Sequence, residues 1–325
     1  MGPGMRVVPY EEVRAVATPG RIVEAVRVGF MAHASGRVRQ ALTSHLAFAG
    51  DGGARAGDCH VKWGHDEAST YFVIKVATSF YSNPQHGLPS SNGLVLLMSA
   101  QTGEPVALLE DRGWLTDART AAAGVLASEA AGIERIDTLG VLGTGIQAGL
   151  QARWIAAHRQ VSRVLVWGRR PGAAGQLVAD LRASGIESAV AERVSDLATQ
   201  SDLIVTTTPS FTPLLMNSDV KDGTAIVAIG ADARGKRELD RALLHRADRI
   251  ICDDPAQCLD HGELQDSGID AGRLERIGEL LLKSETKGAS RAAGVTIVDL
   301  TGIATQDVAA AQACWLALSR SDDWR

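Results

Sequence analysis

The sequence lacks the features that mark several classes of protein. Its 33 Lys and Arg residues and 38 Asp and Glu residues give a net charge of -5 without a long block of one sign, so nucleic acid is not predicted as a partner. Its four cysteines form no CxxC pair, which argues against a disulfide framework and a zinc site and favours reduced thiols; no metal is expected.

Long apolar segments are also missing. Dense apolar runs such as Leu94 to Met98 are short, whereas a membrane span needs roughly 20 residues. The N-terminal stretch MGPGMRVVPYEE shows no apolar core of a signal peptide. With 45% hydrophobic and 22% charged residues, the composition is that of a globular protein. We therefore predict a folded cytoplasmic protein with no membrane partner.

The chain changes its pattern along its length, and 325 residues leave room for two domains. Thr18-Pro19 predicts the start of a helix that Gly36 ends, and residues 41–110 carry short β-type runs typical of antiparallel strands. From Thr138 onward strands and helices alternate, which predicts a doubly wound parallel sheet in an α/β fold. A last helix, Gln306 to Ser319, is expected to pack on the N-terminal part.

A glycine-rich loop follows the predicted strand Asp137 to Leu142 and opens a helix. This G-x-G-x-x-A loop comprises Gly143, Thr144, Gly145, Ile146, Gln147 and Ala148. Gly143 permits a tight turn, and Gly145 allows a pyrophosphate to approach backbone amides at the helix N-terminus. The alternative is an ordinary glycine turn, but the position inside a βαβ unit favours NAD or NADP.

Two further segments bear on the cofactor. The strand Val164 to Trp167 ends in Gly168-Arg169-Arg170, without the acid that NAD-specific enzymes place on the ribose. Arg169 could instead bind a 2′-phosphate, which favours NADP over NAD, or it is a solvated surface arginine. Thr208 and Pro209, at the end of a later strand, could approach the nicotinamide or simply leave the strand.

Three charged residues stand in unusual surroundings. Lys75 lies in the apolar run YFVIKVA, so it needs an anion or is an edge-strand lysine that discourages aggregation. Arg119 is expected in the first turn of an alanine-rich helix for which Thr116 is the expected N-cap, and a cation there opposes the helix dipole. Both could bind one carboxylate, or each could form a structural salt bridge. Asp232 follows a strand and could point toward the cofactor, cap a helix or join a loop salt bridge.

Together these motifs resemble the ornithine cyclodeaminase/mu-crystallin family. The resemblance rests on YFVIKVATSFYSNP, LPSSNGLVLLMSAQTGEPVALLED, LTDARTAAAG, VLGTGIQA, TTTPS, IGADARGKREL and DLTGIATQDVAAAQ. It implies an α+β substrate-binding and dimerisation domain, 1–115 plus 305–325, and a Rossmann-type domain, 116–304. It also implies that Lys75 and Arg119 hold the α-carboxylate of the substrate, that Gly302 lines the same site, and that Asp232, aided by Lys75, serves catalysis.

The family resemblance predicts a homodimeric enzyme that moves a hydride between the nicotinamide and the α-carbon of an imino or amino acid. We expect an NAD(P)H-dependent imine or ketimine reductase, equivalently an amino-acid dehydrogenase. A cyclodeaminase that keeps NAD bound and releases ammonia is the alternative, and a non-catalytic crystallin-like binding protein is a third possibility. The presence of Lys75, Arg119 and Asp232 together argues against the third.

The chain departs from the family pattern at two places. A basic residue expected near Leu42 or Thr43 is missing, so Arg39 or His45 replaces it, or this contact with the carboxylate is absent. Lys62 stands about where ornithine cyclodeaminases place a glutamate for the distal amine. If Lys62 lines the site, the substrate side chain is acidic or uncharged; if the alignment contains a gap, Lys62 is only a surface charge.

Overall fold

The computed structural model describes residues 4–50, 55–80, 82–287 and 292–321. The chain forms two compact units, one made of Met1–Arg119 and Ile303–Arg325 and the other of Thr120–Gly302. Helix α3 (Trp114–Ala130) runs through the first boundary. The functional domains expected from the sequence, 1–115 plus 305–325 and 116–304, stay a prediction.

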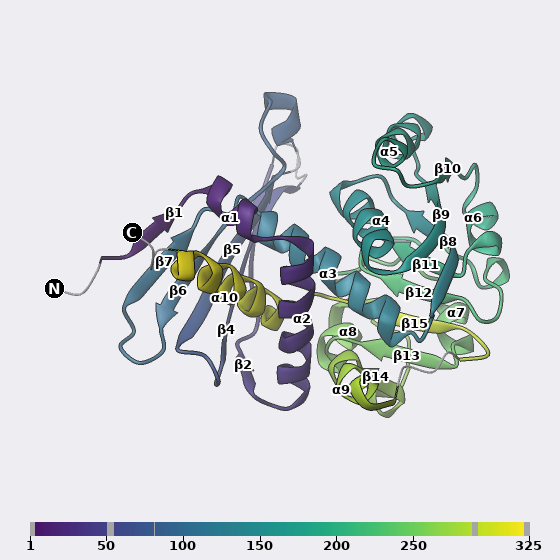
Figure 1. Ribbon diagram of the computed structural model, residues 1–325. Coiled ribbons are helices and arrows are strands. Elements are labelled where there is room, and N and C mark those ends of the chain that lie inside the picture. The colour runs from purple at the N-terminus through teal and green to yellow at the C-terminus, as the bar shows by residue number, and fades with distance from the viewer. Residues whose placement is uncertain (1–3, 51–54, 81, 288–291, 322–325) are drawn as a thin grey trace. The chain divides into compact units, whose positions relative to one another are not determined.

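The first unit is built on a seven-stranded sheet (Figure 1). The strand order is β1-β7-β6-β5-β4-β2, with β3 paired to β4, and all pairs except β1 with β7 are antiparallel. The strands are β1 (Arg6–Val8), β2 (Val38–Gln40), β3 (Ser44–Ala49), β4 (Arg55–Asp66), β5 (Tyr71–Phe80), β6 (Ser91–Ser99) and β7 (Pro105–Leu109). The antiparallel arrangement predicted for residues 41–110 is confirmed.

This unit contains the helices α1 (Tyr10–Val16), α2 (Pro19–Ala34) and α10 (Ala304–Ser321), together with the first part of α3. Helix α2 begins after Thr18, with Pro19 in its first turn, and ends before Gly36, whose φ of 72° suits a glycine. Its residues Ile22, Val23, Val26 and Phe30 are buried, and α10 lies beside it across the sheet (Figure 1). The last helix therefore packs on the N-terminal part of the chain, as predicted.

The two faces of this sheet differ in what covers them. One face, which we call the inner face, carries Val73, Lys75 and Val95, all at most 2% exposed, and packs under α10. The opposite, outer face carries Ile74 and Leu96, which are only half-buried. Because side chains alternate along a strand and directly paired residues share a face, the register assigns every β4 and β5 residue to one face.

The second unit contains an eight-stranded parallel sheet with helices on both faces, α4 and α5 on one side and α6 and α7 on the other (Figure 1). The strand order is β10-β9-β8-β11-β12-β15-β13-β14. The strands are β8 (Arg135–Leu142), β9 (Gln160–Trp167), β10 (Ser188–Val190), β11 (Leu203–Thr206), β12 (Ala225–Ala228), β13 (Arg249–Cys252), β14 (Leu274–Arg276) and β15 (Thr296–Asp299). The α/β fold class predicted from the sequence is confirmed.

The helices of this unit connect the strands in the doubly wound manner. Besides the second half of α3 they are α4 (Ile146–His158), α5 (Pro171–Ala183), α6 (Val194–Gln200), α7 (Arg241–Arg246), α8 (Pro255–His261) and α9 (Ile277–Lys287). The chain winds outward from β8 through β9 to β10 and then returns to β11 on the other side of β8. Such a reversal of strand order opens a crevice at the carboxyl ends of the strands, where ligands of these folds bind.

Helix α3 corrects one expectation about capping. The helix begins at Trp114, so Thr116 lies inside its first turn and is not the N-cap. Arg112 and Gly113, with φ values of 50° and 85°, form the turn before it, and Asp111 Oδ2 accepts a hydrogen bond from the Leu115 amide at 3.0 Å. Arg119 therefore lies beyond the first turn, and the argument that it opposes the helix dipole is weakened.

Two absences hold for the described parts of the chain. None of their helices has both the length and the apolar character that crossing a membrane requires. Their four cysteines are all free thiols, of which Cys252, Cys258 and Cys314 are buried.

Candidate active site

Lys75 lies in the middle of the first unit, on β5 between β4 and β6. The edge-strand alternative is thereby excluded. Its side chain is 3% exposed, and Nζ lies 2.9 Å from Asp307 Oδ1 on α10. A lysine buried to this degree is stabilised by an anion, and Asp307 supplies one.

Arg119 binds the same carboxylate. Its Nε lies 3.0 Å from Asp307 Oδ1, and its Nη1 donates a hydrogen bond of 2.7 Å to Gln306 Oε1. The structure therefore brings Lys75 and Arg119 together, as the sequence analysis expected. It also shows that each is part of an internal salt bridge, with an acid that sequence reasoning missed. The available signal was an Asp among small and apolar residues in DLTGIATQDVAAAQ.

The electrostatics of this cluster leave an excess of positive charge. Burial tends to raise the pKa of Asp307, but the charges of Arg119, Lys75 and Lys62 outweigh it and lower the pKa below its usual range. Burial lowers the pKa of Lys75 to about 7, since the attraction of Asp307 compensates only in part. Asp111 is a further acid close enough to act on Lys75, but burial raises its pKa. With Lys75 protonated, Lys75 and Arg119 share the carboxylate of Asp307, so the carboxylate of a ligand would balance part of the remaining positive charge.

Lys62 stands directly opposite Lys75 across the β4–β5 pair. The two side chains share the inner face, and the charge of Lys62 acts on both Lys75 and Asp307. Of the two candidates for the missing basic residue, Arg39 is paired with His65 and so belongs to the outer face, where it binds Glu67 at 2.5 Å. His45 pairs with His60 and therefore lies on the inner face.

The glycine-rich loop joins β8 to α4 in the second unit. Gly145 is the N-cap of α4, no side chain caps the helix there, and a Cβ on Gly145 would meet nothing within 4 Å. The amides of the first turn are thus available to a phosphate, with the helix dipole favouring negative charge. Gly143 has a φ of 128°, and a Cβ there would lie 2.3 Å from Thr207 Oγ1. These residues fit the pyrophosphate of a dinucleotide.

The other predicted cofactor residues also lie at the carboxyl end of this sheet, because the carboxyl ends of parallel strands point in the same direction. Arg169 follows β9 and is exposed. Thr208 and Pro209 follow β11, which lies next to β8. Ile146 and Gln147 form the first turn of α4, and Thr144 packs so closely on Gly168 that a Cβ there would lie 2.3 Å from Thr144 Cγ2.

Asp232 follows β12, the strand next to β11, at the same edge of the sheet. Its side chain is 53% exposed, and its Oδ1 lies 2.5 Å from Lys236 Nζ. The loop salt bridge that the sequence analysis named as an alternative is therefore present. An exposed carboxylate at this edge remains able to act on a ligand of the crevice.

Two buried acids that the sequence analysis missed support this edge. Glu238 accepts hydrogen bonds from the Thr206 hydroxyl, from the amide and hydroxyl of Thr208 and from the Gly230 amide, so it ties the loops after β11 and β12 together. Asp253 Oδ2 accepts a 2.7 Å hydrogen bond from the amide of Gly302, whose φ of 81° suits a glycine. These acids and most of their hydrogen-bond partners are far apart in the chain, so no sequence pattern predicts the contacts.

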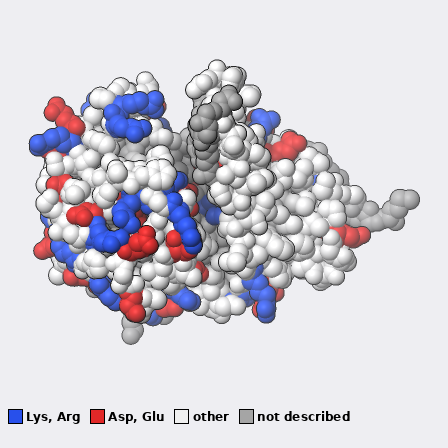
Figure 2. All heavy atoms as spheres, turned by 180° about the vertical axis from the view of Figure 1, so that it is seen from behind, with Lys and Arg blue, Asp and Glu red and all other residues white. Residues whose placement is uncertain are grey.

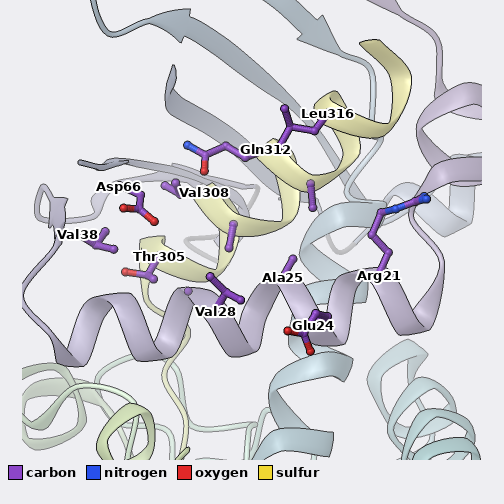
Figure 3. Close-up of a pocket in the computed structure, with 13 residues that line it drawn as sticks. Arg21, Glu24, Ala25, Val28, Val38, Asp66, Thr305, Val308, Gln312 and Leu316 are labelled. Atoms are coloured by element: carbon purple, nitrogen blue, oxygen red, sulfur yellow. The ribbon is translucent and has the colours of Figure 1, made fainter. Parts of the chain in front are cut away.

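A groove between α2 and α10 is lined by apolar and small residues together with Arg21, Glu24, Asp66 and Gln312 (Figure 3). None of the site residues predicted from the sequence lines it. We therefore do not assign the candidate site to this groove. The inner face around Lys75 in the first unit and the strand ends of the second unit are each candidates by themselves.

Comparison with known proteins agrees with these features. The ornithine cyclodeaminase/mu-crystallin family matches residues 7–319. The iminosuccinate reductase of Paracoccus denitrificans is 33% identical, with 95% of each chain covered, and its structure in complex with NAD+ superposes with a TM-score of 0.86 over 98% of both chains at 30% identity. An archaeal alanine dehydrogenase dimer with bound NAD gives a TM-score of 0.87 at 30% identity, covering 98% of this chain and 97% of that one.

A third relative is described as an uncharacterized cyclodeaminase of Sinorhizobium fredii and is 37% identical over 82% of this chain and 81% of its own. Fold and site thus define a protein of the class that combines a Rossmann-type dinucleotide-binding unit with a smaller α+β unit. The chain belongs to the ornithine cyclodeaminase/mu-crystallin family, and the resemblance found in the sequence is confirmed.

Proposed function

We propose that this protein is an NAD(P)H-dependent reductase of imino acids, able in reverse to act as an amino-acid dehydrogenase. One observation carries the proposal: Lys75 and Arg119 are both buried against the carboxylate of Asp307, in a chain whose second unit carries a dinucleotide loop. The relatives named above are reductases, dehydrogenases and cyclodeaminases, which supports the class of reaction.

Each side chain has a separate task in this proposal. Lys75 and Arg119 bind the α-carboxylate of the substrate, and the planar guanidinium fixes its orientation. Asp232 stabilises the positive charge on the substrate nitrogen and holds its proton. The nicotinamide cofactor, held by the loop from Gly143 to Gln147, supplies or accepts the hydride. Gly302, whose amide is fixed by Asp253, contributes backbone to the substrate site.

The test is a panel of imino acids, formed from 2-oxo acids with ammonia or supplied as preformed cyclic imines, assayed with NADPH and NADH. A reductase consumes the reduced cofactor in proportion to the amino acid formed. A cyclodeaminase, the second candidate, releases ammonia from a diamino acid without net consumption of NAD(P)H. If neither activity occurs while the dinucleotide binds, the non-catalytic alternative is correct and the proposal is wrong.

Lys62 favours the reductase over an ornithine cyclodeaminase. It shares the inner face with Lys75 and adds a positive charge, so it would repel the distal ammonium of ornithine. A substrate with an acidic or uncharged side chain fits this position better.

NADP is proposed as the preferred cofactor because Arg169 is exposed directly after β9. In Arg169→Ala we expect the KM for NADPH to rise by about 10-fold or more, the effect of losing a charge-assisted pair with a phosphate, while the KM for NADH changes by less than about 3-fold. Steady-state kinetics with both cofactors provide the measurement, and Arg241→Ala, at an exposed arginine of α7, is the control. Equal changes for both cofactors would contradict the assignment.

A homodimer formed through the outer face of the seven-stranded sheet is proposed as the working assembly. This face carries Trp63, Leu94, Leu46 and Phe48, which are 47%, 37%, 59% and 37% exposed. The view from behind shows few charged side chains over most of the face that this unit presents there (Figure 2). A broad apolar sheet face of this kind is usually covered by another protein surface, and a dimeric relative indicates a second copy.

Trp63→Asp is expected to convert the dimer to a monomer, because it places a charge in the middle of the apolar face. Light scattering after size exclusion should report the chain mass of 34.2 kDa for the variant and twice that mass for the wild type. Leu282→Asp, at a 38% exposed leucine of α9, should leave the dimer intact. If the Trp63→Asp protein remains dimeric, the outer face does not form the dimer interface.

A further inference from the structure

A second set of polar side chains continues along the inner face beyond Lys75. On β4 the residues at alternate positions are Lys62, His60 and Asp58, which therefore share that face. Lys62 stands opposite Lys75, His60 opposite Ala77, and His45 of β3 opposite His60. Two residues along a strand span about 7 Å. The row of Lys62, His60 and Asp58 therefore begins beside Lys75 and extends away from it.

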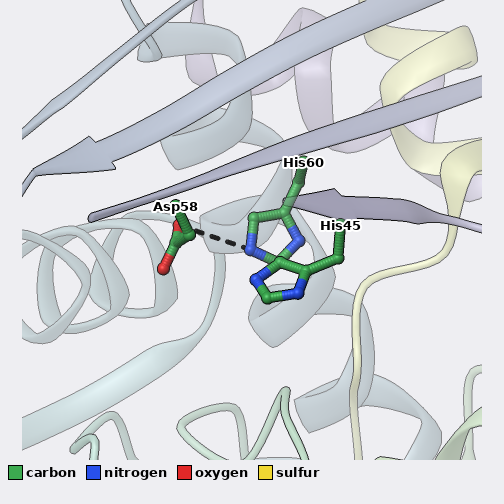
Figure 4. Close-up of side chains that lie close together, drawn as sticks. All are labelled: His45, Asp58 and His60. Atoms are coloured by element: carbon green, nitrogen blue, oxygen red, sulfur yellow. Dashed lines mark ion pairs between the residues drawn. The ribbon is translucent and has the colours of Figure 1, made fainter. Parts of the chain in front are cut away.

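Asp58, His60 and His45 form a compact group (Figure 4). One polar atom from each of the three side chains lies within 4.8 Å of the other two, and the centroids of the two imidazole rings are 4.6 Å apart, with the rings tilted by 45°. Asp58 is 4% exposed, and its Oδ1 lies 3.4 Å from His60 Nε2. The buried carboxylate thus orients the His60 ring and compensates its charge when it is an imidazolium, which then donates from both ring nitrogens.

The sheet surface between this group and the Lys75 cluster carries only short side chains. Ala77 stands opposite His60 on one side and opposite Gly93 on the other. Both small residues are half-buried, whereas Lys75 and Val95 in the next row are buried under the helices. The inner face therefore becomes accessible where the side chains are short, next to two basic groups, Lys62 and His60.

We propose, on the basis of the proposed function, that Lys62 and His60 form a second carboxylate subsite, which takes the side-chain carboxylate of a four- or five-carbon dicarboxylic imino acid. Lys75 and Arg119 hold the α-carboxylate, and the distal carboxylate lies over Ala77 toward Lys62 and His60. Asp58 and His45 are positioning residues that act through the His60 ring. Substrates with a distal ammonium are excluded by the same charges.

A divalent metal is the other ligand that two imidazoles and a carboxylate could take. The surroundings favour an anion, because the next residue on the same face is Lys62 and the one opposite it is Lys75. A metal ion bound at Asp58 and His60 would lie beside these two amines. Zinc ion alone is therefore the probe that separates the two assignments.

The experiment compares the imine of oxaloacetate with the imine of pyruvate, each formed with ammonia, as the ratio of their kcat/KM values. Oxidation of NAD(P)H without ammonia is subtracted, which removes direct reduction of the 2-oxo acid. We expect the wild type to favour the dicarboxylic imine by about 100-fold, and His60→Asn and Lys62→Gln each to lower that ratio by about 10-fold or more. His245→Gln, at an exposed histidine of α7, makes a similar change elsewhere and should leave both kcat/KM values unchanged.

Several results would overturn the subsite. The first is a wild type that prefers the pyruvate imine. The second is a ratio of kcat/KM values that neither His60→Asn nor Lys62→Gln changes. The third is tight binding of Zn2+ in calorimetry that His60→Asn abolishes. If His60→Asn does not fold, as judged by its melting temperature, Lys62→Gln alone decides. These outcomes differ from failure of the proposed function, in which no imino acid of the panel supports ammonia-dependent oxidation of NAD(P)H.

Discussion

Lys75→Met is expected to lower kcat/KM for imino acids by about 10²- to 10³-fold, mainly through a higher KM. In the proposed function the amine is one of two cations that hold the α-carboxylate, and truncating one partner of a buried charged pair costs a factor of this size. Methionine keeps most of the volume of the lysine side chain. In the variant, Asp307 still forms an ion pair with Arg119 at 3.0 Å. The buried carboxylate therefore keeps a cationic partner, and the variant should fold.

The control for this variant is Lys221→Met, which removes a partly exposed lysine bound to Asp202. It should leave KM unchanged, since exposed ion pairs contribute little. A Lys75→Met enzyme with the KM of the wild type would show that Lys75 only neutralises Asp307. In that case the buried pair is structural, and Arg119 alone could bind the substrate.

The pH dependence of carboxylate binding gives an independent measure of the same role. Burial lowers the pKa of Lys75 to about 7, so the amine is cationic below this pH and neutral above it. The affinity for pyrrole-2-carboxylate, a planar carboxylate without a basic nitrogen, should fall by about 10-fold as the pH rises through 7 and then level off, because the contact with Arg119 remains. Lys75→Met should bind weakly at every pH, without this step.

The sequence predicted those parts of the site that depend on local patterns. The turn at Gly143, the helix that begins at Ile146 and the alternating strands each follow from neighbouring residues. The apolar neighbours of Lys75 indicated an anionic partner, but the partner, Asp307, is 232 residues away in the chain. No local pattern links the two, so only the packing of α10 on β5 identifies it.

The wrong N-cap and the open choice between Arg39 and His45 have the same physical origin. Thr116 is a good N-cap residue by type, but the turn at Arg112 and Gly113 and the carboxylate of Asp111 start the helix earlier. Arg39 and His45 were equivalent candidates in the sequence, and strand pairing places them on opposite faces of one sheet. Register and capping are set by contacts between segments, which the order of residues alone leaves undetermined.

Asp232→Asn is expected to lower turnover by about 10²-fold or more while the dinucleotide binds as in the wild type. The substitution keeps the shape of the side chain and removes its charge and its ability to exchange a proton with the substrate nitrogen. Turnover under saturating imino acid and cofactor, together with calorimetric titration of the cofactor, provides the measurement.

The salt bridge between Asp232 and Lys236 allows a matched control. If Asp232 only stabilises its loop through this bridge, Lys236→Gln breaks the same contact and should reduce turnover as much as Asp232→Asn does. If Asp232 acts on the substrate, Lys236→Gln should lose less than about 10-fold, and Asp232→Glu should recover part of the activity because the carboxylate is restored. Equal losses in Asp232→Asn and Lys236→Gln would therefore assign Asp232 to the loop and remove it from the reaction.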